Sequence, residues 1–155
     1  MNEAKKSLGR LADFPPYQLS VTSNEVSSAI ADRYRARFGL KIAEWRVMAV
    51  LGDRGAATQR ELTDVIMMDK VAVNRACKVL EGRGLLTRRP NTKDGRSHLL
   101  DLTGDGREMH DEVMPFAKSI EDEIYAVLTQ TECDQLSYLL RRLFKSAQSV
   151  RPTTR

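Results

Sequence analysis

The sequence has few aromatic, cysteine and histidine residues, and each shortage removes a class of site. Aromatic residues make up 6% of the 155 positions, so we do not expect a large aromatic-lined catalytic cavity. Cys77 and Cys133 lie far apart and provide no disulfide framework. His98 and His110 are the only histidines, which leaves few candidates for acid–base catalysis and no ligand set with zinc spacing. The sequence therefore predicts neither a metal site nor another cofactor.

Long apolar runs and nucleotide-binding motifs are also missing. No stretch approaches the roughly 20 apolar residues that span a bilayer, and the N-terminal segment lacks the apolar core of a signal peptide. We therefore expect a cytoplasmic protein with no membrane partner. The chain contains no P-loop, no glycine-rich nucleotide motif, no HExxH motif and no plausible Ser-His-Asp set. These absences predict a protein that is not an enzyme.

Positive charge is concentrated in one stretch of thirty residues. The whole chain has a net charge of +4, whereas residues 69–98 hold eight basic and three acidic side chains, a net charge of +5. The remaining residues hold 17 basic and 18 acidic side chains. Such a local basic surface is typical of a protein that binds a polyanion, most often nucleic acid, although a solvated basic surface has the same composition. The eight cations are Lys70, Arg75, Lys78, Arg83, Arg88, Arg89, Lys93 and Arg96.

Two helices are predicted before the basic stretch. After the break at Pro15-Pro16, apolar residues recur every four positions from about Tyr17 to Phe38, and Gly39 ends the pattern. A second helix is expected from Ile42 to about Asp53, and its mostly apolar surface favours a buried position.

The next segment has the pattern of a helix-turn-helix. Thr58 and Glu61 have the spacing of a capping box, and the short helix that follows is expected to bury Leu62, Val65 and Ile66. Asp69 is the expected N-cap of a helix that runs to about Arg83 and stops at Gly84. Its inward residues are expected to be Val73, Ala76, Cys77 and Leu80.

A short β-hairpin and two helices complete the predicted order, α-α-α-α-β-β-α-α. Residues 85–89 and 97–102 have strand-like patterns, and the turn-forming sequence NTKDG lies between them. Thr103 is expected to cap a helix that reaches about Leu128, and Thr131 to open the last helix. The last helix has an apolar face that favours dimerisation, although it could also pack within the chain; we assign to it Leu136, Leu139, Leu140, Leu143 and Phe144. The fold class is mainly α with a small β-hairpin wing.

The outward face of the helix at 69–83 suits a DNA groove. An α-helix fits the major groove, and asparagine, arginine and valine can contact adenine, guanine and the thymine methyl group. Lys70, in the first turn, is placed for a phosphate. The alternative is that some of these side chains are simply solvated. The predicted contacts on this face are Lys70, Val71, Asn74, Arg75 and Lys78.

The hairpin provides a second predicted DNA contact. Arg96 follows the Asp-Gly turn and is placed to enter a minor groove, where A·T-rich sequence attracts arginine. Phosphate contacts are expected from Arg88, Arg89 and Lys93. Asp94 would repel phosphate unless it pairs with a cation, and Arg75 is the candidate partner that would stabilise the wing. A simple aspartate turn residue would give the same sequence.

Residues 42–106 resemble the MarR family of bacterial winged-helix transcriptional regulators. The matching segments are EWRVMAVL, TQRELTDVI, MDKVAVNRACKVLEGRGLLTRRP and NTKDGRSHLLDLTGDG. The signature of the last segment consists of Asp94, Arg96, Leu102, Thr103 and Gly106.

The resemblance implies a homodimer that binds a palindromic site in double-stranded DNA. It implies a DNA-binding winged helix-turn-helix at 40–103 and a helical dimerisation region at 17–38 and 104–149, all within one MarR-like chain, 1–155. It also implies a repressor that a small aromatic or acidic effector releases from DNA. Residues 17–38 lack the cysteine of the oxidation-sensing branch, and Cys77 on an inward face is expected to be inert.

Three residues are candidates for an effector site. Apolar residues flank Arg46, so a half-buried guanidinium is expected, held either by a ligand carboxylate or by an internal salt bridge. Tyr17 and Trp45 are candidates to line the same pocket, and core packing is the alternative for both. The alternative for the whole chain is a helical protein–protein adaptor that uses the basic hairpin against an acidic partner.

Overall fold

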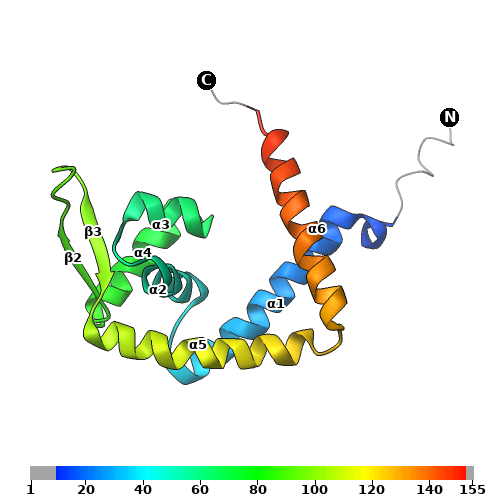
Figure 1. The fold of residues 1–155 in the computed structure, drawn as a ribbon, viewed down its shortest axis with the longest axis horizontal. Helices are drawn as coiled ribbons and strands as arrows, with labels where there is room; N and C mark the ends of the chain where they lie inside the picture. The colour runs from blue at the N-terminus through cyan, green and yellow to red at the C-terminus, as the bar shows by residue number, and fades with distance from the viewer. Residues whose placement is uncertain (1–9, 153–155) are drawn as a thin grey trace. The chain divides into compact units, whose positions relative to one another are not determined.

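The first long helix, α1 (Pro15–Phe38), follows a short 3-10 turn, η1 (Leu11–Asp13), in a computed structural model that describes residues 10–152 (Figure 1). Helix α1 starts at the two prolines, where the sequence pattern had suggested a break before Tyr17. The first turn of a helix needs no N–H donors, so proline is favoured there. Gly39 ends the helix with φ of 65°, as predicted.

Helix α2 (Ile42–Arg54) lies in the centre of the winged-helix region. Val47, Met48 and Leu51 are fully buried, which agrees with the predicted buried position, and Gly55 ends the helix with φ of 80°. The helix also buries Glu44, which is only 4% exposed. Its carboxylate accepts a hydrogen bond from the Lys41 backbone N–H at 2.9 Å and so satisfies the start of the helix.

The predicted helix-turn-helix is present as α3 (Gln59–Ile66) and α4 (Lys70–Gly82). Thr58 and Glu61 form the expected capping box, and the hydrogen bonds from Thr58 lower the pKa of Glu61. Asp69 caps α4 by accepting from the N–H groups of Val71 and Ala72.

The buried faces of α3 and α4 agree with prediction at all but one position. On α4 every residue of the expected inward stripe is buried, and on α3 Leu62 and Ile66 are buried. Val65 is 38% exposed, so its predicted inward position is wrong. The reason is that α3 is only two turns long and packs along one narrow stripe.

A three-stranded antiparallel sheet contains the hairpin. Strands β2 (Leu86–Pro90) and β3 (His98–Leu102) pair in a register that places Arg88 opposite Leu100. A two-residue strand, β1 (Ala57–Thr58), pairs with the other edge of β3 and gives the order β1-β3-β2. Strand β1 was not predicted, because two residues cannot show an alternating pattern. In Figure 1 the hairpin projects beside α3 and α4.

The chain divides into two compact units, residues 1–117 and 118–155. Helix α5 (Gly104–Tyr125) contains Pro115 and crosses this boundary, and α6 (Gln130–Ser149) belongs to the second unit. Thr129, rather than the predicted Thr131, caps α6, because Thr129 stands three residues before Glu132 and forms a capping box with it. Among residues 10–152, no helix combines the length and the apolar character required to cross a bilayer.

The core of the first unit lies between α2, α4 and the sheet. Its fully buried side chains include Met48, Leu80 and Leu100, and truncating such a residue to alanine typically costs about 2–5 kcal/mol. An aromatic cluster extends this core to α1 and α5. Tyr34 lies 5.2 Å from Trp45 and 6.2 Å from Phe116 between ring centroids, and Phe38 meets Phe116 at 5.5 Å. Burial raises the pKa of Tyr34 to about 12.

Candidate nucleic-acid interface

Helix α4 presents one polar face to solvent. Asp69 fixes its start, and the buried stripe packs the opposite face onto the core. Val71 is apolar and yet 59% exposed, and nothing within the first unit explains this exposure. Asn74 is half-buried, and the remaining predicted contacts of this helix, Lys70, Arg75 and Lys78, are exposed.

The tip of the hairpin is held by its own hydrogen bonds. Asn91 Nδ2 donates to Ser97 Oγ at 2.9 Å, and Asp94 Oδ1 accepts from the Arg96 backbone N–H at 3.1 Å. These bonds leave the side chains of Lys93 and Arg96 exposed. The predicted pairing of Asp94 with Arg75 is wrong, since no ion pair joins them among the described residues. Asp94 acts as a turn residue, the alternative that the sequence had left open.

A different ion pair ties the hairpin to α4. The Arg88 guanidinium donates to both carboxylate oxygens of Glu81, each at 3.1 Å, and this carboxylate raises the pKa of Arg88. Both side chains are about one-third exposed, so the contribution to stability is about 1 kcal/mol. Arg88 was predicted to contact phosphate. In the structure its donors bind Glu81 instead and brace β2 against the helix.

Arg83 is a second cation of the basic stretch with an internal role. Its guanidinium donates to the backbone carbonyls of Phe38, at 2.9 Å, and Gly39, at 3.1 Å. Of the eight cations, six therefore remain exposed without an ion pair in the part of the chain that the structure describes. They lie on α4 and the hairpin: Lys70, Arg75, Lys78, Arg89, Lys93 and Arg96.

A cleft of about 270 Å³ separates the hairpin from the first turn of α3. Arg96 lines one side and Arg60 the other, with His98 on β3 between the two elements. Arg60 is not among the residues predicted from the sequence to contact DNA. The available signal was its place two residues after the N-cap Thr58, beside free helix N–H groups, in a turn that the fold brings next to the hairpin.

The three predicted effector residues do not form one site. Arg46 is exposed, so its expected half-burial is wrong; its apolar neighbours on α2 turn toward the core while it turns outward. Trp45 packs in the aromatic cluster, and its ring stacks on that of His110 with 6.5 Å between the ring centroids. This is core packing, the alternative given for Trp45 from the sequence. Tyr17 is 40% exposed on α1, seventeen residues before the Tyr34 that contacts Trp45.

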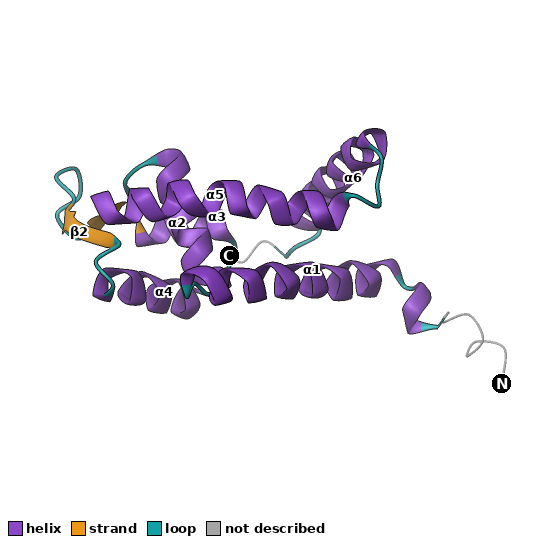
Figure 2. Cartoon of the chain, turned by 90° about the horizontal axis from the view of Figure 1, so that it is seen from below, coloured by secondary structure: helices purple, strands orange, loops and turns teal. Residues whose placement is uncertain are grey.

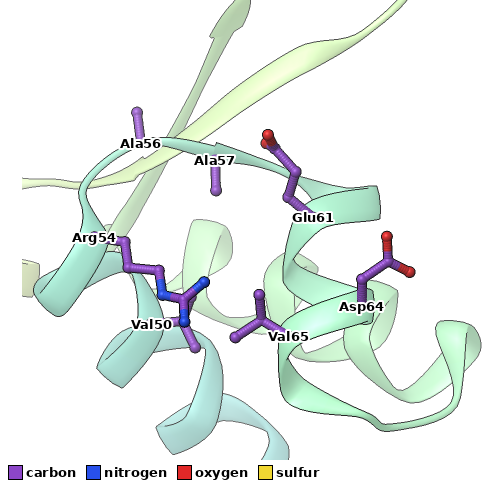
Figure 3. A pocket seen from close by; sticks show the side chains of 7 residues that line it. All are labelled: Val50, Arg54, Ala56, Ala57, Glu61, Asp64 and Val65. Atoms are coloured by element: carbon purple, nitrogen blue, oxygen red, sulfur yellow. The ribbon is translucent and has the colours of Figure 1, made fainter. Parts of the chain in front are cut away.

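A groove runs instead along the surface of α2, between α3 and α5. One part holds about 280 Å³ and the other about 510 Å³, and Val50, Arg54 and Val65 line both. Figure 3 shows the guanidinium of Arg54 pointing into the groove toward Val65. His110 and Met114 of α5 line the larger part. The His110 ring lies so close to Gly52 that a Cβ there would overlap it.

The apolar face of α6 is open to solvent in the single chain. No residue of α6 is buried, and four of the predicted dimerisation residues are 39–56% exposed. These four are Leu139, Leu140, Leu143 and Phe144, and Leu136 is half-buried.

The two cysteines differ in their surroundings. Cys77 is buried on α4, and burial raises the pKa of its thiol to about 11, which agrees with the prediction of an inert residue. Cys133 on α6 is half-buried. Among residues 10–152, no three histidine, cysteine, aspartate or glutamate side chains gather as a metal-binding group.

Comparison with known proteins gives this arrangement a family. The MarR family model matches residues 38–97, from the end of α1 to the hairpin. The crystal structure of a MarR/EmrR family transcriptional regulator from Acinetobacter sp. ADP1 is 25% identical, with a TM-score of 0.83 over 91% of this chain and 99% of that one. The resemblance to the MarR family that the sequence predicts is therefore confirmed over residues 38–97. The fold class predicted from sequence, a winged helix-turn-helix with further helices, is thereby confirmed.

Two other relatives have informative names. The HTH-type transcriptional repressor MdtR of Bacillus subtilis is 29% identical over 111 residues, which cover 72% of each chain. A structure of BpsR from Bordetella bronchiseptica, whose DNA binding is regulated by 6-hydroxynicotinic acid, is 25% identical, with a TM-score of 0.80 over 86% of this chain and 95% of that one. Family members of this kind are transcriptional regulators and not enzymes.

Proposed function

We propose that this chain is a sequence-specific repressor that binds a palindromic DNA operator in the cytoplasm as a homodimer and is released by a small ligand. The observation that supports it best is the set of six exposed cations on α4 and the hairpin, which have no ion-pair partner among residues 10–152. A DNA backbone supplies the anions that such a surface lacks. The name of the MdtR repressor is consistent with this reading.

In this proposal, α4 enters the major groove and the hairpin reaches an adjacent minor groove. Asn74 and Arg75 face base edges, and the exposed Val71 packs on a thymine methyl group. Arg96 at the hairpin tip reads the minor groove. Lys70, Lys78, Arg89 and Lys93 contact phosphates, joined by Arg60 at the start of α3.

We assign dimerisation to residues 17–38 and 104–149, and DNA binding to residues 40–103. The open apolar face of α6 supports this division, because a monomer in water rarely leaves several leucines and a phenylalanine exposed together. A two-fold axis then repeats the reading helix at about 34 Å, one turn of DNA, and the operator is a palindrome.

The groove along α2 is our candidate for the effector site. Its apolar lining is made by Val50, Val65 and Met114, and its charged lining by Arg54 and by three carboxylates, Asp53, Glu61 and Asp64. In this proposal Arg54 is the group that holds the carboxylate of a small aromatic acid. His110 lines the groove and also stacks on Trp45, the only tryptophan, so ligand binding is expected to change the tryptophan emission.

The effector proposal is tested by fluorescence titration with 6-hydroxynicotinic acid, benzoate and the neutral methyl benzoate. We expect the acids to change the emission of Trp45 and to weaken DNA binding, and Arg54→Gln to remove both effects. Arg46→Gln, an exposed arginine on the same helix, is the matched control and should behave as wild type. An equal response in the Arg54 variant would place the ligand elsewhere.

The main proposal is tested by selection of bound sequences from a random DNA library. We expect enrichment of a palindrome whose half-site centres lie about 10 base pairs apart. If no sequence is enriched and no DNA binds at low salt, the chain is not a DNA-binding repressor, and the basic hairpin is better explained by an acidic protein partner.

A further inference from the structure

The segment that follows α4 is fastened to the C-terminal end of α1. Arg83 lies directly after the last residue of α4, and its two terminal nitrogens donate to the carbonyls of Phe38 and Gly39. These carbonyls belong to the end of a helix, where acceptors lack intrahelical donors and the helix dipole is negative. A guanidinium satisfies both requirements with one rigid group. Figure 2 shows α4 and α1 along the same side of the molecule.

The same segment is also fastened to the start of α5. Thr103 Oγ1 donates to the carbonyl of Gly84 at 2.6 Å, and the Thr103 backbone N–H donates to the carbonyl of Leu85 at 3.1 Å. Gly106 allows this approach, because a Cβ there would overlap the Leu85 carbonyl oxygen. Arg83, Gly84 and Leu85 therefore form a junction that joins the end of the reading helix to α1 and α5.

We propose that Arg83 is a positioning residue for DNA binding: it sets the direction of α4 relative to α1, and so the separation of the two reading helices in the dimer. The inference rests on the proposed function. Two hydrogen bonds from one planar group fix an orientation as well as a distance, which a single point contact does not. Small rotations of α4 about this end are amplified along the helix, whose 13 residues extend about 20 Å.

Arg83 is distinct from the cations that face DNA. The proposed base contacts begin at Val71, in the first turn of α4, whereas Arg83 caps the opposite end. Its two terminal nitrogens each donate to a backbone carbonyl at the end of α1, which holds the guanidinium at this end of the helix. Removing Arg83 should therefore change which half-site spacing is bound best and leave the number of phosphate contacts unchanged.

The test measures binding to the selected operator and to versions with half-site spacing changed by one or two base pairs. Arg83→Met removes the donors, and Arg83→Lys keeps the charge but loses the two-carbonyl geometry. The control is Arg89→Met, which removes an equal charge from an exposed residue of the same basic stretch. Circular dichroism of each variant establishes that it is folded, and Arg83→Lys carries the test if Arg83→Met is not.

We expect both Arg83 variants to bind the parent operator about tenfold more weakly, because the binding-competent orientation of α4 is less populated. The preference for the parent spacing should flatten, while the slope of log K against log salt stays at the wild-type value. Arg89→Met should keep the spacing preference and lower that slope by about 0.9.

Two results would overturn the inference while leaving the proposed function intact. One is a wild-type spacing preference in the folded Arg83→Lys protein. The other is a salt slope reduced as in Arg89→Met, which would make Arg83 a phosphate contact. Failure of the wild-type protein to select any operator would instead overturn the proposed function, and the positioning role with it.

Discussion

Helices α4 and α6 are both amphipathic and both capped at their N-termini, yet they expose opposite faces. Helix α4 buries its apolar stripe within the chain and leaves its cations in solvent. Helix α6 has no fully buried residue and leaves most of its apolar face in solvent. The first lacks an anionic partner and the second lacks an apolar one. This contrast supports the proposed DNA-binding dimer, in which a different molecule would complete each surface.

The largest expected effect comes from placing a charge on the open face of α6. Leu140→Glu should raise the dimer dissociation constant at least about 100-fold, because the carboxylate would be buried without a partner. Sedimentation velocity measures the change. Arg141→Gln alters the net charge equally at the neighbouring position and should leave the dimer intact. A stable Leu140→Glu dimer would remove α6 from the interface.

The surface of the hairpin is tested by removing the exposed cation that follows its Asp-Gly turn. Arg96→Ala should weaken operator binding by about 1–3 kcal/mol, since it loses its contacts in the groove. The control Lys145→Ala removes an equal charge from an exposed position of α6 and should bind DNA normally. Fluorescence anisotropy with labelled operator gives both affinities, and equal losses would mean that the effect is one of net charge alone.

Cys77 on α4 and Cys133 on α6 differ in burial, and this difference can be measured. The pKa of Cys77 is raised to about 11 by burial, so the folded state holds this proton more tightly than the unfolded state does. Its contribution to stability is present below the unfolded pKa, near 9, and is lost as pH rises through about 11, up to about 3 kcal/mol.

Urea unfolding of wild type and Cys77→Ala between pH 8 and 11 measures this difference, since other alkaline titrations are common to both proteins. Iodoacetamide at pH 8 should modify Cys133 on α6 and spare Cys77. Rapid modification of Cys77 in the folded protein would show that the inner face of α4 is open.

A smaller effect is expected for Arg88, the cation of the hairpin that binds Glu81 and does not face DNA in our proposal. Arg88→Gln should lower the free energy of unfolding by about 1 kcal/mol, because Glu81 loses its bidentate partner. Its salt slope for DNA binding should equal that of wild type, whereas Arg89→Gln should lower the slope and leave stability unchanged. Urea unfolding and binding titrations in parallel distinguish the two arginines.

Features that depend on neighbouring residues were predictable from sequence. The capping of α3 by Thr58 and of α4 by Asp69 needs only residues within one turn, and the inward stripe of α4 follows from helical spacing. The winged-helix order and the exposed cations of α4 followed from the same local patterns.

Features that depend on distant parts of the chain were not predictable. The partners of Arg83 lie 44 and 45 positions away, and nothing in the basic stretch distinguishes this arginine from its exposed neighbours. Glu81 rather than Asp94 is the anionic partner at the hairpin, because β2 packs against α4 and brings Arg88 beside Glu81. The apolar neighbours of Arg46 in the sequence predict a half-buried side chain, whereas the exposure of Arg46 depends on which side of α2 meets the core.

The most direct test of the account compares the selected operator with a scrambled duplex of equal length and composition over a range of salt concentrations. We predict binding to the operator at least about 10³-fold tighter than to the scrambled duplex, with an affinity that falls steeply as salt rises. Equal affinity for the two duplexes would contradict sequence-specific reading by α4 and the hairpin.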